Sequence, residues 1–252
     1  MSRSGTFALL VRCIHSLMLY LSSLSLFMSS LSFFIHSFSC SFLNHTFRLP
    51  LAARIGYQRD YRGKSPVTSV ALHPNQGELF CTDEDGNLRV WDLAANACVT
   101  EVAPDGQTPL QSVTVASDAS TVAAVSNLGT CFAWRLDPAS TRGTTLEPVQ
   151  RIAAHSTYAL KCLFSPDARY LATTSADQTV KLWDLDNGFA LAKTLVGHTA
   201  WVWSCAFSAD SAYLVTASSD KTAKLWDLKN GEVILDYRGH SKALTSIALN
   251  DC

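Results

Sequence analysis

The sequence lacks the short motifs by which most enzymes and metal proteins are recognised. It contains no phosphate-binding P-loop, no His-Glu-x-x-His zinc motif, no Gly-x-Ser-x-Gly nucleophile turn and no dinucleotide-binding glycine pattern. Its eight cysteines are scattered with no Cys-x-x-Cys pair, so the sequence predicts neither a zinc site nor a thioredoxin-like redox centre. We therefore expect no catalytic residues, no metal, no cofactor and no small-molecule substrate.

Charged residues are absent from a long stretch near the N-terminus. Positions 13–47 contain no Asp, Glu, Lys or Arg, and the first acidic residue of the chain is Asp60. Within this stretch, residues 16–35 form a serine-rich apolar run, and roughly 20 such residues suffice to cross a bilayer as a helix. Three interpretations of residues 1–55 stay open: a membrane anchor, a targeting peptide, or translated non-coding sequence from a faulty gene model.

A strong net charge is also missing. The formal charge is −1, the isoelectric point is about 6.6, and no dense run of Lys or Arg occurs, so nucleic acid is not expected as a partner. Several cysteines fall inside apolar runs, as Cys162 and Cys205 do, where a reduced thiol behaves as a small hydrophobic group. A cytoplasmic setting follows as an expectation.

What the sequence does contain is a repeat. Four similar stretches end around Trp91, Trp134, Trp183 and Trp226, which stand 43 to 49 residues apart. A period of roughly 40–45 residues with a Trp-Asp pair and an upstream Gly-His is typical of β-propeller blades. Short alternating apolar runs between turn residues predict strands, and no segment of the repeat region has a helical period. The predicted fold is all-β: a WD-repeat β-propeller region with four blades plus a lone C-terminal strand.

The repeats divide the chain into two regions. Residues 1–55 are the non-propeller segment rich in Ser, Leu and Phe, and residues 56–252 are the propeller region. The predicted blades cover approximately 64–100, 109–150, 154–195 and 197–237, and a partial repeat follows at 239–252. The lone strand of that partial repeat is expected at 243–249.

Polar residues recur at fixed places in the repeats. An Asp stands six residues before the Trp in three of the four, and a His precedes the third and the fourth blade. A catalytic set is needed once, whereas a recurring set suits hydrogen bonds that hold each blade together. The predicted network comprises Asp85 and Trp91 in the first blade, His155, Ser175, Asp177 and Trp183 in the third, and His198, Ser218, Asp220 and Trp226 in the fourth.

The second repeat departs from this pattern. It has Leu128 in the place of the Asp, and Arg135 follows Trp134. We expect this blade to be the loosest of the four.

Two particular stretches point to one family. The run His-Pro-Asn-Gln-Gly-Glu-Leu at 73–79 and the segment Trp-Val-Trp at 201–203 are more specific than the Trp-Asp and Gly-His elements that many propellers share. With these, residues 56–252 resemble the family of G-protein-β-subunit-like subunits of the target-of-rapamycin (TOR) kinase complexes. The family propeller has about seven blades, and the N-terminal ones have no counterpart here. The resemblance therefore implies an incomplete arc of four blades plus the lone C-terminal strand, with the sheets at both ends exposed.

The resemblance implies a function. Its members are non-enzymatic scaffold subunits of TORC1 and TORC2, which bind and support the catalytic region of TOR, a large phosphatidylinositol-3-kinase-like protein kinase, in nutrient and growth signalling. It also implies a cytoplasmic protein that meets endomembranes through its complex. Two alternatives stay open: a WD-repeat adaptor in another complex, such as a ubiquitin ligase or a chromatin complex, and a membrane-tethered propeller if the N-terminal segment is a real anchor.

The loop before the fourth blade is the predicted partner-binding site. Trp201 and Trp203 lie two positions apart at the start of a predicted strand, so at least one of them should face solvent. One interpretation has both packed between blades. The other, which the resemblance supports, makes them a binding hot spot, extended by Tyr158 of the preceding loop and Lys242 of the following one.

Overall fold

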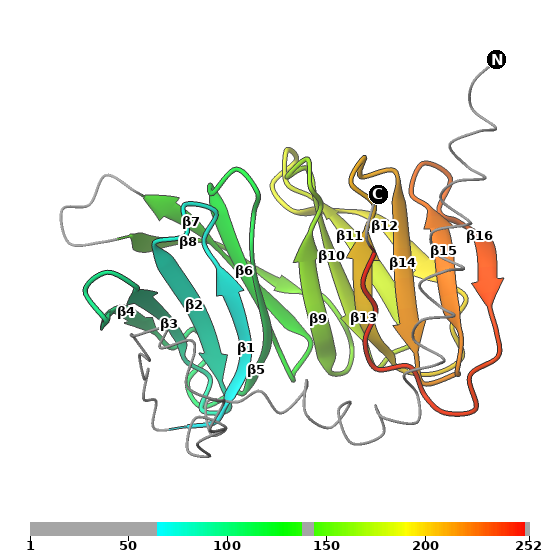
Figure 1. Ribbon diagram of the computed structural model, residues 1–252, viewed down its shortest axis with the longest axis horizontal. Coiled ribbons are helices and arrows are strands. Elements are labelled where there is room, and N and C mark those ends of the chain that lie inside the picture. The colour runs from blue at the N-terminus through cyan, green and yellow to red at the C-terminus, as the bar shows by residue number, and fades with distance from the viewer. Residues whose placement is uncertain (1–64, 138–143, 250–252) are drawn as a thin grey trace, which may run out of the picture. The chain divides into compact units, whose positions relative to one another are not determined.

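The computed structural model describes residues 65–137 and 144–249 (Figure 1). These residues form strands β1 to β16 and no helix, so the all-β prediction is confirmed. No helix long and apolar enough to span a membrane occurs in these two ranges. The predicted non-propeller region at 1–55, with its apolar run, lies outside the described residues, and so do positions 250–252 of the predicted partial repeat.

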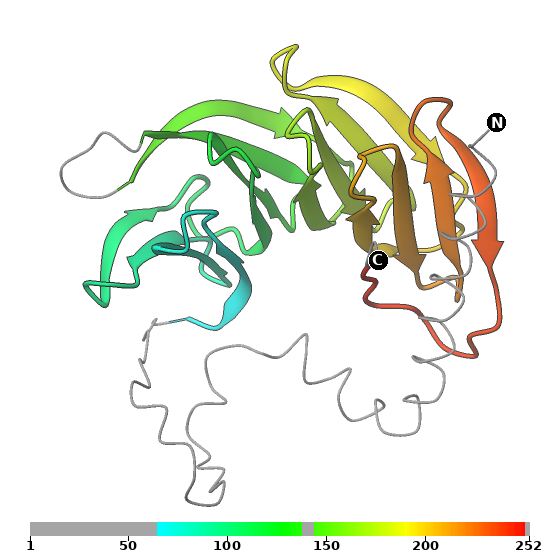
Figure 2. The same cartoon turned by 45° about the horizontal axis from the view of Figure 1, so that its top comes forward.

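The strands form four antiparallel sheets, each built from four strands that follow one another in the sequence (Figure 2). The first sheet holds β1 (Val67–Leu72), β2 (Glu78–Asp83), β3 (Leu88–Asp92) and β4 (Ala97–Val102). The second holds β5 (Leu110–Val115), β6 (Thr121–Ser126), β7 (Thr130–Asp137) and β8 (Thr145–Ala153). The third holds β9 (Ala159–Phe164), β10 (Tyr170–Ser175), β11 (Thr179–Asp184) and β12 (Ala190–Val196). The fourth holds β13 (Val202–Phe207), β14 (Tyr213–Ser218), β15 (Ala223–Asp227) and β16 (Glu232–Tyr237). Four-stranded sheets of consecutive strands are the blades of a propeller.

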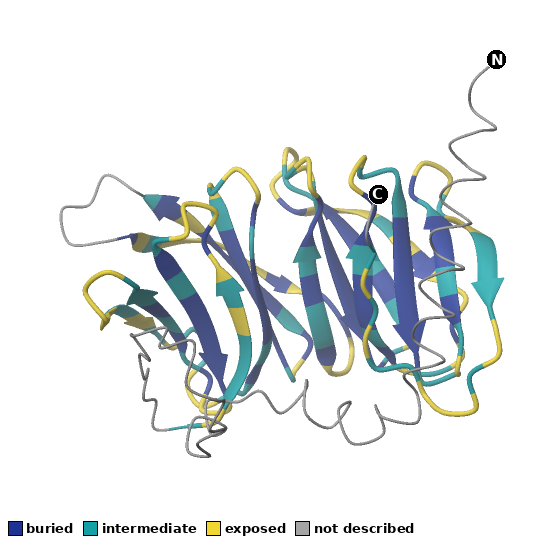
Figure 3. Cartoon of the chain, viewed as in Figure 1, coloured by how far each residue is buried: buried dark blue, intermediate teal, exposed yellow. Residues whose placement is uncertain are grey.

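Burial falls from the second strand of a sheet to its last strand. In β6, β10 and β14 every residue after the first is buried, whereas most residues of β8 and β12 are exposed (Figure 3). A strand covered on both faces is a nearly continuous apolar or small-residue run, because neither face has to meet water. The sequence Leu214-Val-Thr-Ala-Ser218 of β14 is such a run, and its two hydroxyl groups need partners inside the protein.

The chain divides into two compact units at a boundary within β9, after Cys162, and each unit is described by itself. In the unit that ends at Cys162, β1 and β2 contact β5, and large apolar residues fill the space between the first two sheets. Its core comprises Phe80, Leu88, Val90, Leu110, Val113, Val122, Ala124, Phe132, Trp134 and Leu136.

In the unit that begins at Leu163, β10 contacts β13. Its core is assembled in the same way, from strands of the third and fourth sheets. It comprises Ala172, Val180, Leu182, Leu195, Val202, Cys205, Phe207, Leu214, Trp226 and Leu228.

A β-bulge recurs at the beginning of three first strands. The pairing of β1 with β2, of β5 with β6 and of β13 with β14 skips one residue, which is Thr68, Gln111 and Trp203 respectively. A bulge leaves the extra residue outside the ladder and redirects its side chain. Trp203 is therefore released from the strict inward and outward alternation of β13.

The segment at 243–249 is not the lone strand that the sequence predicted. The last strand of the described residues is β16, which ends at Tyr237. In the following segment the backbone N–H of Leu244 donates to the carbonyl oxygen of Ser218 at 3.0 Å. A strand requires a ladder of such bonds to a neighbour. The apolar alternation at 243–249 indicated only that this segment is suited to a strand, and the described residues supply no ladder for it.

Candidate functional site

The fourth sheet contains a chain of buried hydrogen bonds. The indole N–H of Trp226 donates to Oγ1 of Thr216 at 2.9 Å, and Thr216 Oγ1 lies 2.7 Å from Nε2 of His198. His198 Nδ1 in turn lies 2.7 Å from Oδ2 of Asp220. An ionised carboxylate only accepts, so Nδ1 carries the proton and Nε2 accepts from the Thr216 hydroxyl. This chain, which we name the Trp226 relay, joins β15, β14 and the loop before β13.

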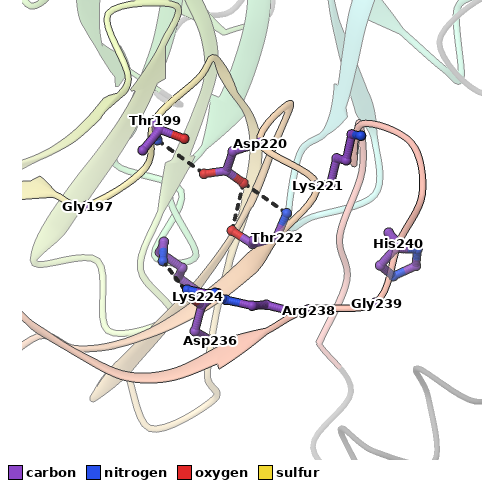
Figure 4. A pocket seen from close by; sticks show the side chains of 10 residues that line it. All are labelled: Gly197, Thr199, Asp220, Lys221, Thr222, Lys224, Asp236, Arg238, Gly239 and His240. Carbon is purple, nitrogen blue, oxygen red and sulfur yellow. Dashed lines mark hydrogen bonds and ion pairs between the residues drawn. The ribbon is translucent and has the colours of Figure 1, made fainter.

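Asp220 also orders the turn in which it stands. Its Oδ1 accepts from the backbone N–H and the hydroxyl of Thr222, at 2.9 and 2.7 Å, and its Oδ2 accepts from the N–H of Thr199 at 3.2 Å (Figure 4). Burial alone would raise the pKa of Asp220, but the bonds from Thr222 and His198 outweigh it and bring the pKa to about 2. The carboxylate therefore stays ionised at neutral pH, as the relay requires.

The relay has a composition that could suggest a hydrolase, because it joins a hydroxyl, an imidazole and a carboxylate. Thr216 is 0 % exposed and His198 is 5 % exposed, so no substrate reaches the hydroxyl. The hydroxyl also accepts the bond of Trp226, which occupies one of its lone pairs. The arrangement joins the elements of a blade and is not suited to nucleophilic attack.

Ser218, the last residue of β14, does not lie between His198 and Trp226. Its hydroxyl accepts from the N–H of Asp220 at 3.1 Å and donates to the carbonyl of Ala200 at 3.2 Å. The link between imidazole and indole is Thr216, which the sequence prediction missed. A signal for it exists: a Thr stands ten residues before the Trp in both the third and the fourth repeat.

The third sheet repeats part of this arrangement. Trp183 donates to Oγ1 of Thr173 at 3.0 Å, and Asp177 accepts from the N–H and hydroxyl of Thr179 at 3.0 and 2.7 Å. Ser175 accepts from the N–H of Asp177 at 3.0 Å, as Ser218 does in the fourth sheet. His155, the fourth predicted member, is buried at 7 % exposure in the unit that ends at Cys162.

The first sheet departs from the predicted network. Asp85 is exposed, and in the described residues its backbone N–H, not its carboxylate, bonds to Ser65. Asp83 takes over: it is 1 % exposed, accepts from the N–H of Asn87 at 2.8 Å and pairs with Arg89. The residue ten positions before Trp91 is Cys81, which has no hydroxyl to offer the indole. The prediction that Asp85 belongs to the network is therefore wrong, and Asp83 takes its place.

The second sheet lacks the carboxylate and the hydroxyl of the relay. Leu128 is 63 % exposed at the position of Asp220, and Ala124 occupies the position of Thr216. Trp134 is buried all the same and stacks on Phe132 with a ring-centre distance of 6.0 Å. That this blade is the loosest stays a prediction.

The relay predicts an acid-sensitive fold. Burial lowers the pKa of His198 below its ordinary 6.5, although Asp220 opposes this, so the unfolded chain takes up a proton that the folded chain does not and stability falls as the pH drops through 6.5. The pKa of Asp220 falls from 3.8 to about 2, so a second loss, of up to about 2 kcal/mol, is expected between about pH 4 and pH 2. Urea unfolding at pH 7, 5 and 3 measures the first loss and the upper part of the second. In the variant Asp220→Asn the second loss should shrink, and equal losses in the two proteins would refute the assignment.

Trp201 and Trp203 form an aromatic pair at the beginning of β13. Their ring centres are 5.5 Å apart, and Trp201 is 42 % exposed, so one of the two faces solvent as predicted. The indole N–H of Trp203 donates to Oγ of Ser219 at 2.6 Å, and the N–H of Ser219 donates to the carbonyl of Trp201 at 2.9 Å. The pair is therefore fixed on the β14–β15 turn, next to Asp220.

The two other predicted partner-binding residues are also accessible. Lys242 is exposed in the segment after β16. Tyr158 is 48 % exposed in the loop before β9 and belongs to the unit that ends at Cys162. Each lies on the surface of its own unit. Among the described residues, no group of three or more His, Cys, Asp or Glu side chains could hold a metal ion.

Comparison with known proteins agrees with the repeat structure. The WD40 family, described as WD domain, G-beta repeat, matches residues 57–92, 146–184 and 189–227. The chain is 52 % identical over 196 residues to target of rapamycin complex subunit wat1 of Schizosaccharomyces pombe, covering 77 % of this chain and 62 % of that protein. It is 50 % identical over 193 residues to target of rapamycin complex subunit LST8 of Saccharomyces cerevisiae, covering 77 % and 63 %.

A plant relative matches over a shorter stretch. Over 141 residues the chain is 49 % identical to the Arabidopsis thaliana protein named non-functional target of rapamycin complex subunit LST8-2, covering 56 % of this chain and 45 % of that protein. The chain spans less than two thirds of the length of each of these relatives. All three are named as subunits of a target of rapamycin complex. The chain contains WD40 repeats and is homologous over 77 % of its length to proteins named as subunits of target of rapamycin complexes.

Proposed function

We propose that this chain is a non-catalytic subunit of a TOR-type kinase complex and that it binds the catalytic region of the kinase. The relatives named as TOR complex subunits, about half identical to this chain, support membership of such a complex. The proposal that the contact is made to the kinase itself rests on the surface of the fourth sheet. Cytoplasmic localisation, with endomembranes met only through the complex, is part of the same proposal.

The observation that carries the proposed contact is the Trp201–Trp203 pair. Trp supplies a large contact area at a low cost in side-chain entropy and is enriched among binding hot spots. A hydrogen bond to Ser219 holds the Trp203 ring, which contacts the Trp201 ring. Little side-chain entropy is therefore lost when a partner covers Trp201. A partner can also contact the ammonium group of Lys242 on this unit, and the phenol of Tyr158 on the unit that ends at Cys162.

The test is co-purification of a TOR-type kinase with the tagged full chain. We expect Trp201→Ala with Trp203→Ala to weaken the association by at least about 2 kcal/mol, roughly thirtyfold in affinity, because the anchor of the contact is removed. Val196→Ala is the matched control, since Val196 is 70 % exposed on the outer strand β12 of the same unit. Thermal unfolding of each variant separates loss of binding from loss of fold.

Two outcomes contradict the proposal in different ways. If the double variant retains the kinase as well as Val196→Ala does, the assignment of the contact to the two Trp residues is wrong. If the unchanged chain retrieves no such kinase and instead retrieves a ubiquitin ligase or a chromatin complex, the proposed function itself is wrong.

A further inference from the structure

Backbone hydrogen bonds join the segment after the second sheet to the β6–β7 turn, but the described residues show no such bonds between the segment after the fourth sheet and the β14–β15 turn. After the second sheet, the N–H groups of Ala154 and His155 both donate to the carbonyl of Gly129 at 2.9 Å. Lys221 occupies the position of Gly129 in the fourth sheet. In the described part of the chain, neither Gly239 nor His240 makes such a bond to Lys221.

Glycine positions confirm this difference. A methyl group at Gly197 would lie 3.0 Å from the ring of Trp226, whereas at the equivalent Gly239 it would meet nothing within 4 Å. The result is a hollow of about 400 Å³ between the β14–β15 turn and the segment after β16 (Figure 4). Three cationic side chains line it: Lys221, Lys224 and Arg238.

The two carboxylates of the hollow are already occupied. Asp220 accepts from Thr222 and His198. Oδ2 of Asp236 lies 3.1 Å from the Lys224 ammonium and 2.8 Å from Nη2 of Arg238, and its Oδ1 is buried without a partner in the described residues. Burial would raise the pKa of Asp236, but the bonds from Arg238 and Lys224 outweigh it and lower the pKa. Both carboxylates therefore stay ionised, and their negative charge is already paired with neighbouring donors of the protein.

The donors that remain point to an anion. The side chains of Lys221 and His240 have no hydrogen-bond or ion-pair partner in the described residues, and both line the hollow, Lys221 from the turn and His240 from the segment after β16 (Figure 4). Nη1 of Arg238 has no bond there either, since Asp236 engages its Nε and Nη2. Three separate donors with a net positive charge suit an oxyanion with several oxygens better than a planar carboxylate.

We propose that this hollow binds a phosphate monoester, through Lys221, His240 and the free edge of Arg238. The site is separate from the Trp201–Trp203 contact, and the inference does not rest on the proposed function. A phosphorylated side chain of another polypeptide and a free phosphate offer the same chemistry. The experiment distinguishes these two sources.

The test is a titration of the ¹⁵N-labelled full chain, followed by the amide shifts of Gly197, Thr199 and Gly239. The probes are inorganic phosphate and N-acetyl-phosphoserine amide at constant ionic strength. We expect saturable shifts confined to these amides, and binding about tenfold weaker in Lys221→Gln and in His240→Gln, because each removes one charge-assisted bond. Lys229→Gln, which removes an exposed Lys outside the hollow of the same unit, should leave the affinity unchanged.

Lys221→Gly keeps the test decisive if Lys221→Gln proves unstable. Glycine occupies this turn position in the first two sheets, at Gly86 and Gly129, so the backbone accepts it, and the variant should also bind about tenfold more weakly. Tighter binding of the phosphoserine amide than of inorganic phosphate would assign the site to a phosphorylated side chain, and equal binding to the free anion. Shifts that do not saturate, or that are equal in the Lys221 variants and Lys229→Gln, would overturn the proposal.

Discussion

Replacing Gly129 with Ala is expected to lower the free energy of unfolding by about 3–5 kcal/mol. Gly129 has φ +79°, a conformation that costs an L-residue about 1–2 kcal/mol. The added methyl group would overlap the carbonyl oxygens of His155 and Thr157, and such overlap costs about 1–3 kcal/mol more. Both neighbours are backbone atoms of a loop that is bonded to the Gly129 carbonyl, so they cannot turn aside as a side chain would.

Gly106→Ala is the matched control for this substitution. Gly106 belongs to the same unit and has φ +66°, but a methyl group there would meet nothing within 4 Å. The control therefore carries only the conformational cost of about 1–2 kcal/mol. Urea unfolding followed by Trp fluorescence gives both values. If the two variants lose the same stability, the close approach of the following loop to Gly129 does not hold this junction together.

The repeat made much of the blade structure predictable from the sequence. Strands, turns and the Asp of the fourth sheet follow from residue types at fixed intervals, because each blade solves the same packing problem. Thr216 was missed because a Thr inside a β-strand is common and gives no signal until two repeats are compared. Asp85 was misassigned because Asp83, two residues earlier, offers the same group from a buried position beside Arg89.

The candidate contact surface was only partly predictable. Alternation places Trp201 and Trp203 on one side of the strand, but the exposure of Trp201 depends on the bulge at Trp203 and on the bond to Ser219. These depend on the register between β13 and β14, which a single strand does not show. For the same reason the pattern at 243–249 predicted a strand, although strand formation depends on a neighbour that local sequence does not specify.

The second large effect is expected at Thr216. Thr216→Val keeps the shape of the side chain but removes the hydroxyl, so the Trp226 indole N–H and His198 Nε2 both lose their partner in a buried site. Each group left unsatisfied costs about 1–3 kcal/mol, and the expected loss is about 2–5 kcal/mol in the free energy of unfolding. Thr216→Ser keeps the hydroxyl and loses one methyl group, so it should cost about 1 kcal/mol.

A double-mutant cycle shows whether the loss comes from the Trp226 relay. Trp226→Phe removes the indole N–H, so in its presence Thr216→Val leaves only His198 unsatisfied. The cost of Thr216→Val should therefore be smaller in the Trp226→Phe background, by about 1–3 kcal/mol, whereas independent sites would give additive costs. Additive costs in urea unfolding, or a Thr216→Val variant as stable as Thr216→Ser, would show that the bonds of Thr216 do not stabilise the blade. A combined cost smaller than the sum of the two single costs would mean that the buried hydroxyl stabilises the blade through its hydrogen bonds to Trp226 and His198.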